Sequence, residues 1–257
     1  MQTFTVNIQA LHKFLQAGTE DADGNKVTDL NLARNAISGI KQEGKLLNKS
    51  IEAEKIANEL LACLEKNPEA FPERCATVYT YSSFLFHDLN KALRENDVGK
   101  GKNLGAFCKF VIDYLNYPQI ALRAPEEFLA TKHHPVTGKE YKEPWPILFR
   151  GVPLTESEID AYKNAVGKVI YWNSIISTSK NRQVAKIFGN NTVFSIVLQR
   201  SNTLGFRARD VSALSKMPDE EEVLLTPGNA FYVEVVEKVG DTTWIGLCKC
   251  GIHCMGF

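Results

Sequence analysis

The sequence has no excess of charge of either sign, because 30 lysines and arginines balance 30 aspartates and glutamates. A chain without net charge has no general attraction for nucleic acid or an anionic membrane, so we expect neither partner. No hydrophobic run approaches the ~20 residues that a membrane-spanning helix needs. Residues 1–10 lack the basic start and apolar centre of a secretory leader. We therefore expect a cytoplasmic protein, or a secreted mature form whose leader was removed.

The cysteines lack the spacing of metal ligands. Cys248, Cys250 and Cys254 lie close together beside His253. A zinc site would need a second short pair of Cys or His residues elsewhere, and the sequence shows none. We therefore expect no metal, and terminal disulfides or buried thiols instead.

The first half of the chain is predicted to be mainly helical. The whole chain has 257 residues, 44% of them hydrophobic, which suits one large domain or two small lobes. Apolar residues recur at helical spacing in the ranges 28–66, 76–95 and 104–115. Residues 118–146 contain five prolines and are predicted to be irregular.

From Pro146 onward, β-branched and aromatic residues are separated by Gly, Asn and Pro, a pattern that predicts strands. A helix that begins with the capping box Thr155 and Glu158 is expected among them. Another helix is expected at 180–188, with Ser179 as its N-cap. Strands are predicted at 147–149, 169–177, 192–199, 222–225, 231–238 and 243–248.

Three consecutive glutamates precede one of these strands. In an extended backbone Glu220 and Glu222 would share a face while Glu221 points away. Two carboxylates on one face repel each other, which costs stability unless a cation or a reaction needs them. The alternative is a solvated acidic turn, since Asp219 precedes them and charge runs commonly remain at the surface.

Two other short motifs carry groups that could bind an anion. Arg150 ends an apolar strand, where it could bind a phosphate, and Gly151 would let a ligand approach the backbone. Ser177 and Ser179 share one strand face, and Lys180 and Arg182 would begin the next helix, where anions bind readily. The alternatives are an arginine that only reaches solvent and a serine that only caps a helix.

Together, an arginine, a hydroxyl pair and a carboxylate pair suit a phosphorylated sugar whose glycosidic bond breaks. A carboxylate stabilises the oxocarbenium-like transition state over the neutral sugar. NAD contains such a bond beside a pyrophosphate.

The order of these motifs resembles the arginine-specific mono-ADP-ribosyltransferases, the R-S-E class related to vertebrate ecto-enzymes and several bacterial toxins. The resemblance covers roughly residues 76–238. It implies an α+β fold with a helical N-terminal lobe on a β-rich, mixed-sheet NAD-binding core. It also implies a helical region at 1–75 and a catalytic domain at 76–257. The residues that carry it are 148–151, 177–179 and 220–224, with support from 79–80, 89–94, 185–188 and 194–196.

The resemblance implies a role for each central residue. Arg150 would hold the NAD phosphates, and the Gly151 backbone would contact the nicotinamide amide. Ser177 would orient the catalytic carboxylate of Glu222, which would hold the nicotinamide-ribose 2′-hydroxyl. Glu220 would bind and activate the guanidinium of the acceptor.

Further cofactor-binding contacts are expected from Ser179, from Phe188 stacked on nicotinamide, and from Asn90. The loop 209–219 would present an acceptor protein with an exposed arginine, with 211–214 as a candidate contact. We thus predict an NAD–protein-arginine ADP-ribosyltransferase that requires no metal. The alternatives are an NAD glycohydrolase and a non-catalytic NAD-binding or interaction module.

Overall fold

The computed structural model describes residues 8–20, 24–116, 130–133, 136, 138, 140–198 and 208–249. Contacts divide the chain into two compact units. The helical unit comprises Asn7–Tyr117 with Leu214–Lys216, and the β-rich unit comprises the remainder. The division into a helical region at 1–75 and a catalytic domain at 76–257 stays a prediction.

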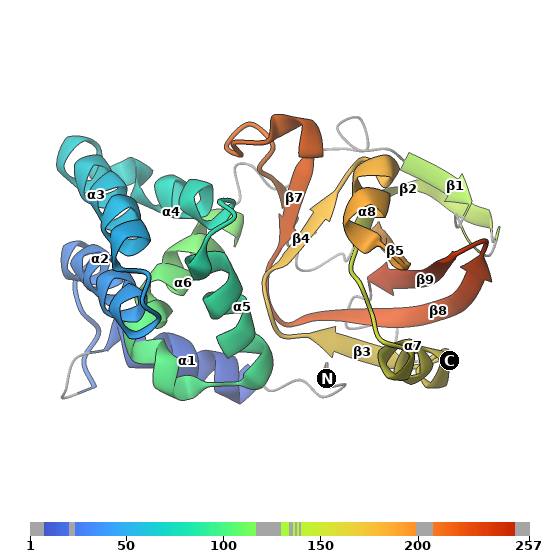
Figure 1. The fold of residues 1–257 in the computed structure, drawn as a ribbon, viewed down its shortest axis with the longest axis horizontal. Helices are drawn as coiled ribbons and strands as arrows, with labels where there is room; N and C mark the ends of the chain where they lie inside the picture. Colours follow the sequence, from blue (N-terminus) through green and yellow to red (C-terminus); the bar gives the residue numbers. More distant parts are fainter. Residues whose placement is uncertain are drawn as a thin grey trace. The chain divides into compact units, whose positions relative to one another are not determined.

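In the helical unit, α6 lies among α1, α2 and α4 (Figure 1). A methyl group on Gly105 of α6 would lie 2.5 Å from the Phe14 carbonyl oxygen of α1, so these two backbones approach closely. The described helices are α1 (Ile8–Thr19), α2 (Asp29–Leu46), α3 (Ser50–Lys66), α4 (Phe71–Tyr79), α5 (Phe84–Glu95) and α6 (Gly101–Asn116), with short 3-10 helices at Pro68–Ala70 and Val98–Lys100.

Two of the predicted helices are each split into two. The range 28–66 breaks between α2 and α3, where Asn48 has a φ of 57°. The range 76–95 breaks after α4, and Ser83 starts α5 by accepting a hydrogen bond from the Phe86 N–H. Apolar spacing continues through both breaks, so periodicity alone does not reveal them.

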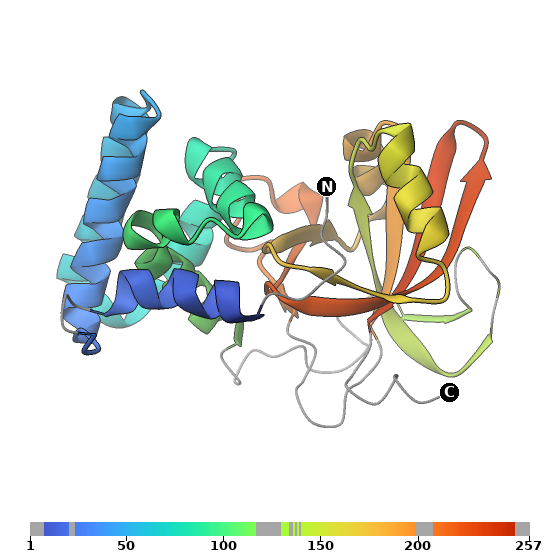
Figure 2. The ribbon, with the colours of Figure 1, turned by 90° about the horizontal axis from the view of Figure 1, so that it is seen from below.

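The described strands form one mixed sheet (Figure 2). Their order is β3-β8-β9-β5-β2-β4-β7-β6, with β1 paired to β2. Only the pairing of β5 with β9 is parallel among these strands. The predicted α+β class is therefore confirmed. The strands are β1 (Ala130–His133), β2 (Glu140–Gly151), β3 (Val169–Trp172), β4 (Ile176–Ser179), β5 (Thr192–Leu198), β6 (Ala208–Asp210), β7 (Glu222–Leu225), β8 (Asn229–Val239) and β9 (Thr242–Lys249).

Helices α7 (Glu156–Asn164) and α8 (Arg182–Gly189) cover opposite faces of the sheet. On β2, Leu148 packs in one core with Ile159 and Tyr162 of α7. The neighbouring residue Phe149 packs in a second core with Ala185 of α8. Successive side chains of a strand point to opposite faces, so β2 contributes to both cores.

Three local predictions can be compared with the described strands and helices. The capping box of Thr155 and Glu158 is present at the start of α7. The range 169–177 is not one strand, because β3 pairs with β8 whereas β4 pairs with β2 and β7. The range 118–146 is not wholly irregular, because its described residues include β1 and most of β2. The terminal residues His253, Cys250 and Cys254 lie outside the described residues.

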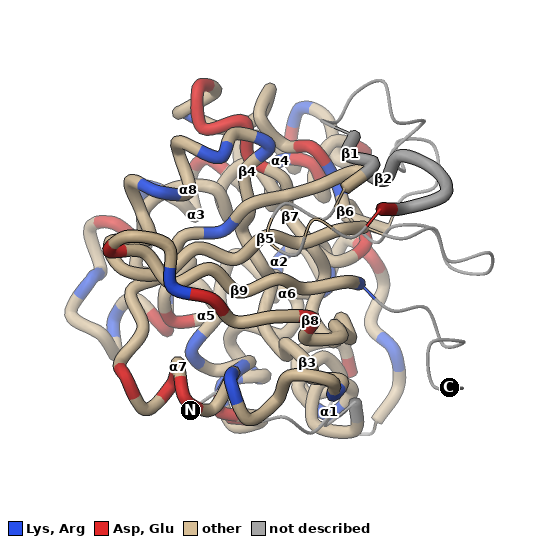
Figure 3. The backbone as a smooth tube through the Cα atoms, turned by 90° about the vertical axis from the view of Figure 1, so that its right-hand side faces the viewer, with Lys and Arg blue, Asp and Glu red and all other residues tan. Residues whose placement is uncertain are grey.

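Charges of both signs are interspersed along the described chain (Figure 3). No described helix combines the length and the apolar character needed to cross a membrane. Among the described cysteines, Cys63 is a half-buried free thiol and Cys75 and Cys108 are buried free thiols. Cys248 is also buried. No cluster of metal-ligating side chains occurs among the described residues.

Candidate active site

Glu222 is the first residue of β7, and its side chain is almost fully buried, with 7% of the residue surface exposed. The hydroxyl of Ser177, on the neighbouring strand β4, donates a hydrogen bond to Glu222 Oε1 over 2.5 Å. Glu222 and Ser177 are thus brought together from positions 45 residues apart.

Burial is the largest influence on Glu222 and raises its pKa to about 7, because the ionised carboxylate loses hydration. The hydrogen bond from Ser177 lowers this pKa and the negative charge of Glu220 raises it. The positive charge of Arg150 has a smaller, lowering effect. A carboxylate with a pKa near 7 changes its ionisation state in the neutral range, as many catalytic acids and bases do.

Arg150 lies next to the end of β2 and connects this strand to β4. Its guanidinium Nη1 donates a hydrogen bond to the carbonyl oxygen of Ser177 over 2.6 Å. The arginine therefore fixes the backbone of the residue whose hydroxyl binds Glu222. Arg150, Ser177 and Glu222 form a continuous hydrogen-bonded chain across β2, β4 and β7.

Gly151 is required for the packing of α8 against β2. A methyl group at position 151 would lie 1.8 Å from the Ala185 carbonyl oxygen and 2.3 Å from the Gly189 nitrogen. Such distances are far below van der Waals contact with backbone atoms that cannot move independently of the helix. Position 151 therefore needs a glycine for packing. The expected contact of its backbone with nicotinamide stays a prediction.

The alternation predicted for the three glutamates is wrong, because the backbone is not extended through them. Glu220 ends the 3-10 helix η5 (Pro218–Glu220), and Glu221 has left-handed φ and ψ values of 47° and 47°. Only Glu222 belongs to the strand. The carboxylates of Glu220 and Glu222 nevertheless lie near enough for the charge of one to affect the pKa of the other.

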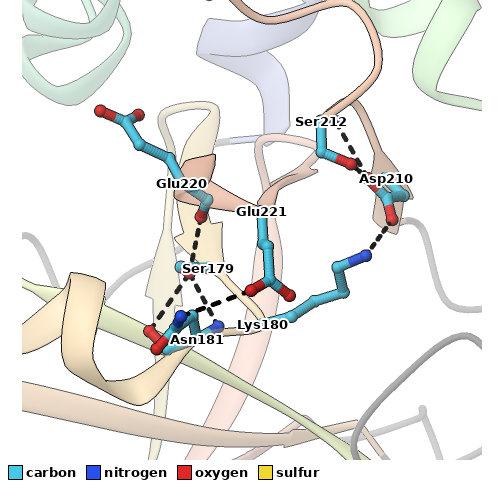
Figure 4. A network of polar contacts seen from close by, with 7 residues as sticks. All are labelled: Ser179, Lys180, Asn181, Asp210, Ser212, Glu220 and Glu221. Carbon is cyan, nitrogen blue, oxygen red and sulfur yellow. Dashed lines mark hydrogen bonds and ion pairs between the residues drawn. The ribbon is translucent and has the colours of Figure 1, made fainter. Parts of the chain in front are cut away.

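Ser179 is not the N-cap of α8; that position is held by Asn181, whose side chain accepts a hydrogen bond from the Gln183 N–H. The Ser179 hydroxyl instead donates to the Glu220 carbonyl oxygen over 2.7 Å. It also accepts from the Asn181 N–H over 2.8 Å (Figure 4). Ser179 therefore supports the glutamate-bearing turn, and its contact with NAD stays a prediction.

The anion site expected at the start of α8 is occupied by other interactions. Lys180 Nζ forms an ion pair with Asp210 over 2.6 Å. The guanidinium of Arg182 lies 4.3 Å from the centre of the Trp244 ring, a cation–π contact. Both cations thus have partners within the protein.

Two predicted cofactor contacts lie in different units. Phe188 is on α8, and its side chain is 55% exposed, which leaves its ring available for stacking. Asn90 is buried in the helical unit, where it donates to the Tyr79 hydroxyl over 2.6 Å. Binding of NAD by either residue stays a prediction.

One predicted acceptor contact does not fit the structure. Val211 is fully buried, and its N–H donates to the Glu222 carbonyl oxygen over 2.9 Å. It can therefore support Glu222 but cannot present itself to another protein. Ala213 and Met217 in the same loop are exposed.

Sequence reasoning missed Asp210, Ser212 and the structural role of Asn181. Asp210 Oδ1 accepts hydrogen bonds from the backbone N–H and the hydroxyl of Ser212, over 2.9 and 2.5 Å. The spacing Asp-x-Ser is a recognisable local hydrogen-bonding motif and could have indicated this turn. The partnership of Asp210 with Lys180, 30 residues away, has no local signal.

Comparisons with solved structures agree with this fold. Exoenzyme S from Pseudomonas aeruginosa, solved with human 14-3-3 protein beta and carba-NAD, is 20% identical, with a TM-score of 0.51 over 89% of this chain and 93% of its own. The type III effector XopAI from Xanthomonas axonopodis pv. citri is 15% identical, with a TM-score of 0.55 over 95% of this chain and 98% of its own. The ADP-ribosyltransferase toxin Plx2a from Paenibacillus larvae is 14% identical, with a TM-score of 0.51 over 84% of this chain and 96% of its own.

No curated protein matches the sequence. A sequence model described as NAD:arginine ADP-ribosyltransferase matches residues 39–255, which include every candidate residue above. The chain therefore belongs to the NAD:arginine ADP-ribosyltransferase family, whose members transfer ADP-ribose from NAD.

Proposed function

We propose that the protein transfers ADP-ribose from NAD to arginine side chains of an acceptor protein. The observation that carries this proposal is the pair of interacting carboxylates, Glu222 with a pKa near 7 and Glu220 beside it. Two carboxylates suit a reaction in which both partners are positively charged. The oxocarbenium-like ribose is one of them and the guanidinium of the acceptor is the other.

Glu222 acts on the NAD side of the reaction. Its ionised carboxylate holds the 2′-hydroxyl of the nicotinamide ribose and stabilises positive charge as the bond to nicotinamide breaks. Nicotinamide leaves with the electron pair of that bond. Ser177 orients the carboxylate through its 2.5 Å hydrogen bond, and Arg150 binds the NAD phosphates. Exoenzyme S, which shares the fold, is bound to carba-NAD, and this supports NAD as the ligand here.

Glu220 acts on the acceptor side. A guanidinium has a pKa above ~12, so its neutral, nucleophilic form is rare in solution. A carboxylate beside it favours binding of the cation and accepts its proton as the new bond from nitrogen to ribose forms. Glu220 is half-exposed, as a group that meets an incoming side chain must be. Met217, 59% exposed, is a candidate contact for the acceptor protein.

The proposal is tested by incubating the protein with NAD and agmatine, a small guanidine compound. We expect ADP-ribosyl-agmatine to accumulate faster than free ADP-ribose. Mostly free ADP-ribose would identify an NAD glycohydrolase that uses the same Glu222. If NAD is not consumed, the protein has only a binding or interaction role.

A further inference from the structure

One dipeptide, Lys180-Asn181, is bonded to Asp210 at the start of the loop 209–219, which we call the acceptor loop, and to Glu221 just after its end. At the start of the loop, the Lys180 ammonium pairs with Asp210 over 2.6 Å, and the two side chains are only 18% and 27% exposed. Burial alone would raise the pKa of Asp210, but Lys180 and Ser212 together hold it below its usual range. Asp210 is therefore ionised at neutral pH and remains bonded to Lys180.

The same dipeptide binds the turn that follows the acceptor loop. The backbone N–H of Lys180 donates to the Glu221 carbonyl oxygen over 3.1 Å. The side-chain amide of Asn181 donates to Glu221 Oε1 over 3.3 Å. Glu221 is thus held in its left-handed conformation by two donors from adjacent residues, and Ser179 holds the carbonyl of Glu220 beside it.

These contacts leave the Glu220 carboxylate uncommitted. Its side chain points away from the network of bonds formed by its neighbours (Figure 4). Within the part of the chain that the structure describes, Glu220 accepts bonds only through its backbone carbonyl. The turn is therefore fixed by its backbone and by Glu221, while the carboxylate of Glu220 remains available for a ligand.

Glu222 is held by a different set of contacts. Its carboxylate is bonded to Ser177, and its backbone lies within the pairing of β4 with β7. Loss of the Lys180 or Asn181 side chain removes neither contact. A change at the dipeptide should therefore move Glu220 relative to Glu222 without removing the group that acts on NAD.

We propose that Lys180 and Asn181 are positioning residues that set Glu220 for the acceptor guanidinium. This inference rests on the proposed arginine transfer. It assigns the side chains of the dipeptide to the choice between arginine and water as acceptor, and leaves the cleavage of NAD to Arg150, Ser177 and Glu222. Because small displacements of a reacting group reduce rates strongly, we expect the loss of either side chain to affect transfer far more than hydrolysis.

The test compares transfer to agmatine with hydrolysis of NAD in matched variants. Lys180→Met removes the charge but keeps the length of the side chain, and Lys180→Arg restores the charge. Asn181→Ser keeps an N-cap for α8 and removes the amide that reaches Glu221. The control is Lys163→Met, which breaks the 2.8 Å pair with Asp160 on α7 of the same unit.

We expect Lys180→Met and Asn181→Ser to lower the ratio of transfer to hydrolysis about tenfold, with kcat/KM for NAD hydrolysis unchanged. Lys180→Arg should recover most of the ratio, and Lys163→Met should leave it as in the unchanged protein. An unaltered ratio in both Lys180→Met and Asn181→Ser overturns the positioning role. An equal fall in transfer and hydrolysis also overturns it, because that result indicates general damage to the site.

Hydrogen exchange separates this inference from the proposed function. Residues around Asp210, at the start of the acceptor loop, should exchange faster in Lys180→Met than in Lys163→Met, because this variant removes the ion pair between Lys180 and Asp210. Unchanged exchange overturns the inference whatever the acceptor is. Faster exchange in a protein that never labels agmatine would instead contradict the arginine proposal and restrict the dipeptide to holding the loop.

Discussion

Ser177 binds the Glu222 carboxylate across a diagonal of the β4–β7 pair, although the residue directly opposite Glu222 is Ser179. Ser177 itself lies opposite Leu224. Diagonal neighbours in an antiparallel pair are within reach of side chains on the same face. The two hydroxyls of this face thus have separate tasks: Ser177 binds the carboxylate, and Ser179 binds the backbone of the preceding turn.

The rate of NAD cleavage should depend on the ionisation of Glu222. Its pKa is about 7 and the ionised form is the one that stabilises a cation, so kcat/KM for NAD should rise as the pH increases through about 7. Ser177→Ala removes a hydrogen bond that lowers this pKa, so the midpoint should move to higher pH. Initial rates of NAD hydrolysis between about pH 5 and pH 9 measure this midpoint.

Two further variants make this prediction specific. Glu220→Gln removes a charge that raises the pKa of Glu222, so the midpoint should move to lower pH. Ser157→Ala, an exposed serine on α7, should leave it in place. A midpoint near 4.5, the ordinary value for a glutamate, would show that burial does not perturb Glu222 in solution.

Glu222→Gln should abolish activity and yet stabilise the protein at neutral pH. The folded-state pKa of about 7 lies above the ordinary value of 4.5, so between these values the folded protein holds a proton that the unfolded chain has lost. The free energy of unfolding contributed by Glu222 therefore falls as the pH rises through this window, by about 3 kcal/mol in total. The side chain of the glutamine variant does not ionise, so its free energy of unfolding should not fall in this way.

Urea denaturation at about pH 5 and pH 8 measures the effect in both proteins. Other shifted carboxyls, such as Asp88 and Glu43, are present in both, so the difference between the two proteins isolates Glu222. Equal pH dependence in the two proteins would contradict the raised pKa.

The two interacting glutamates should have separable roles. Glu220→Gln should spare NAD hydrolysis and lose transfer to agmatine, because only the acceptor side needs its charge. Glu222→Gln should abolish both activities. Glu221→Gln is the matched control: its amide oxygen can still accept the bond from Asn181, so both activities should remain. Agmatine labelling that is unchanged in Glu220→Gln would refute this division.

The elements that sequence predicts well are those with local signals. The capping box of Thr155 and Glu158 identifies the start of α7. The short apolar run of β7 identifies a strand whose two faces are both buried. The breaks at Asn48 and before Ser83 were missed because apolar spacing continues on both sides of them. Asn48 marks the first break by its left-handed backbone, and Ser83 marks the second as the N-cap of α5.

The candidate site shows the same division. The order of the motifs identifies Arg150, Ser177 and Glu222, and the structure brings these three together. The relation of Glu220 to Glu222 was predicted from strand alternation, which does not apply, since Glu221 adopts a left-handed conformation. Few residues other than glycine do so, and the contacts that hold Glu221 come from Lys180 and Asn181, about 40 residues away.

Gly151→Ala should destabilise the protein, which would distinguish a packing role for this glycine from a role in admitting a ligand. The added methyl group would meet the backbone of α8 at Ala185 and Gly189, so the helix would have to move away from β2. Overpacking of this kind costs roughly 1–3 kcal/mol or more. Thermal unfolding without NAD measures the loss, with Gly99→Ala as the control, because its new methyl group would meet only the Asp97 side chain, at 3.2 Å. If Gly151→Ala is as stable as the unchanged protein but binds NAD more weakly, the glycine serves the ligand and α8 does not pack this closely against β2.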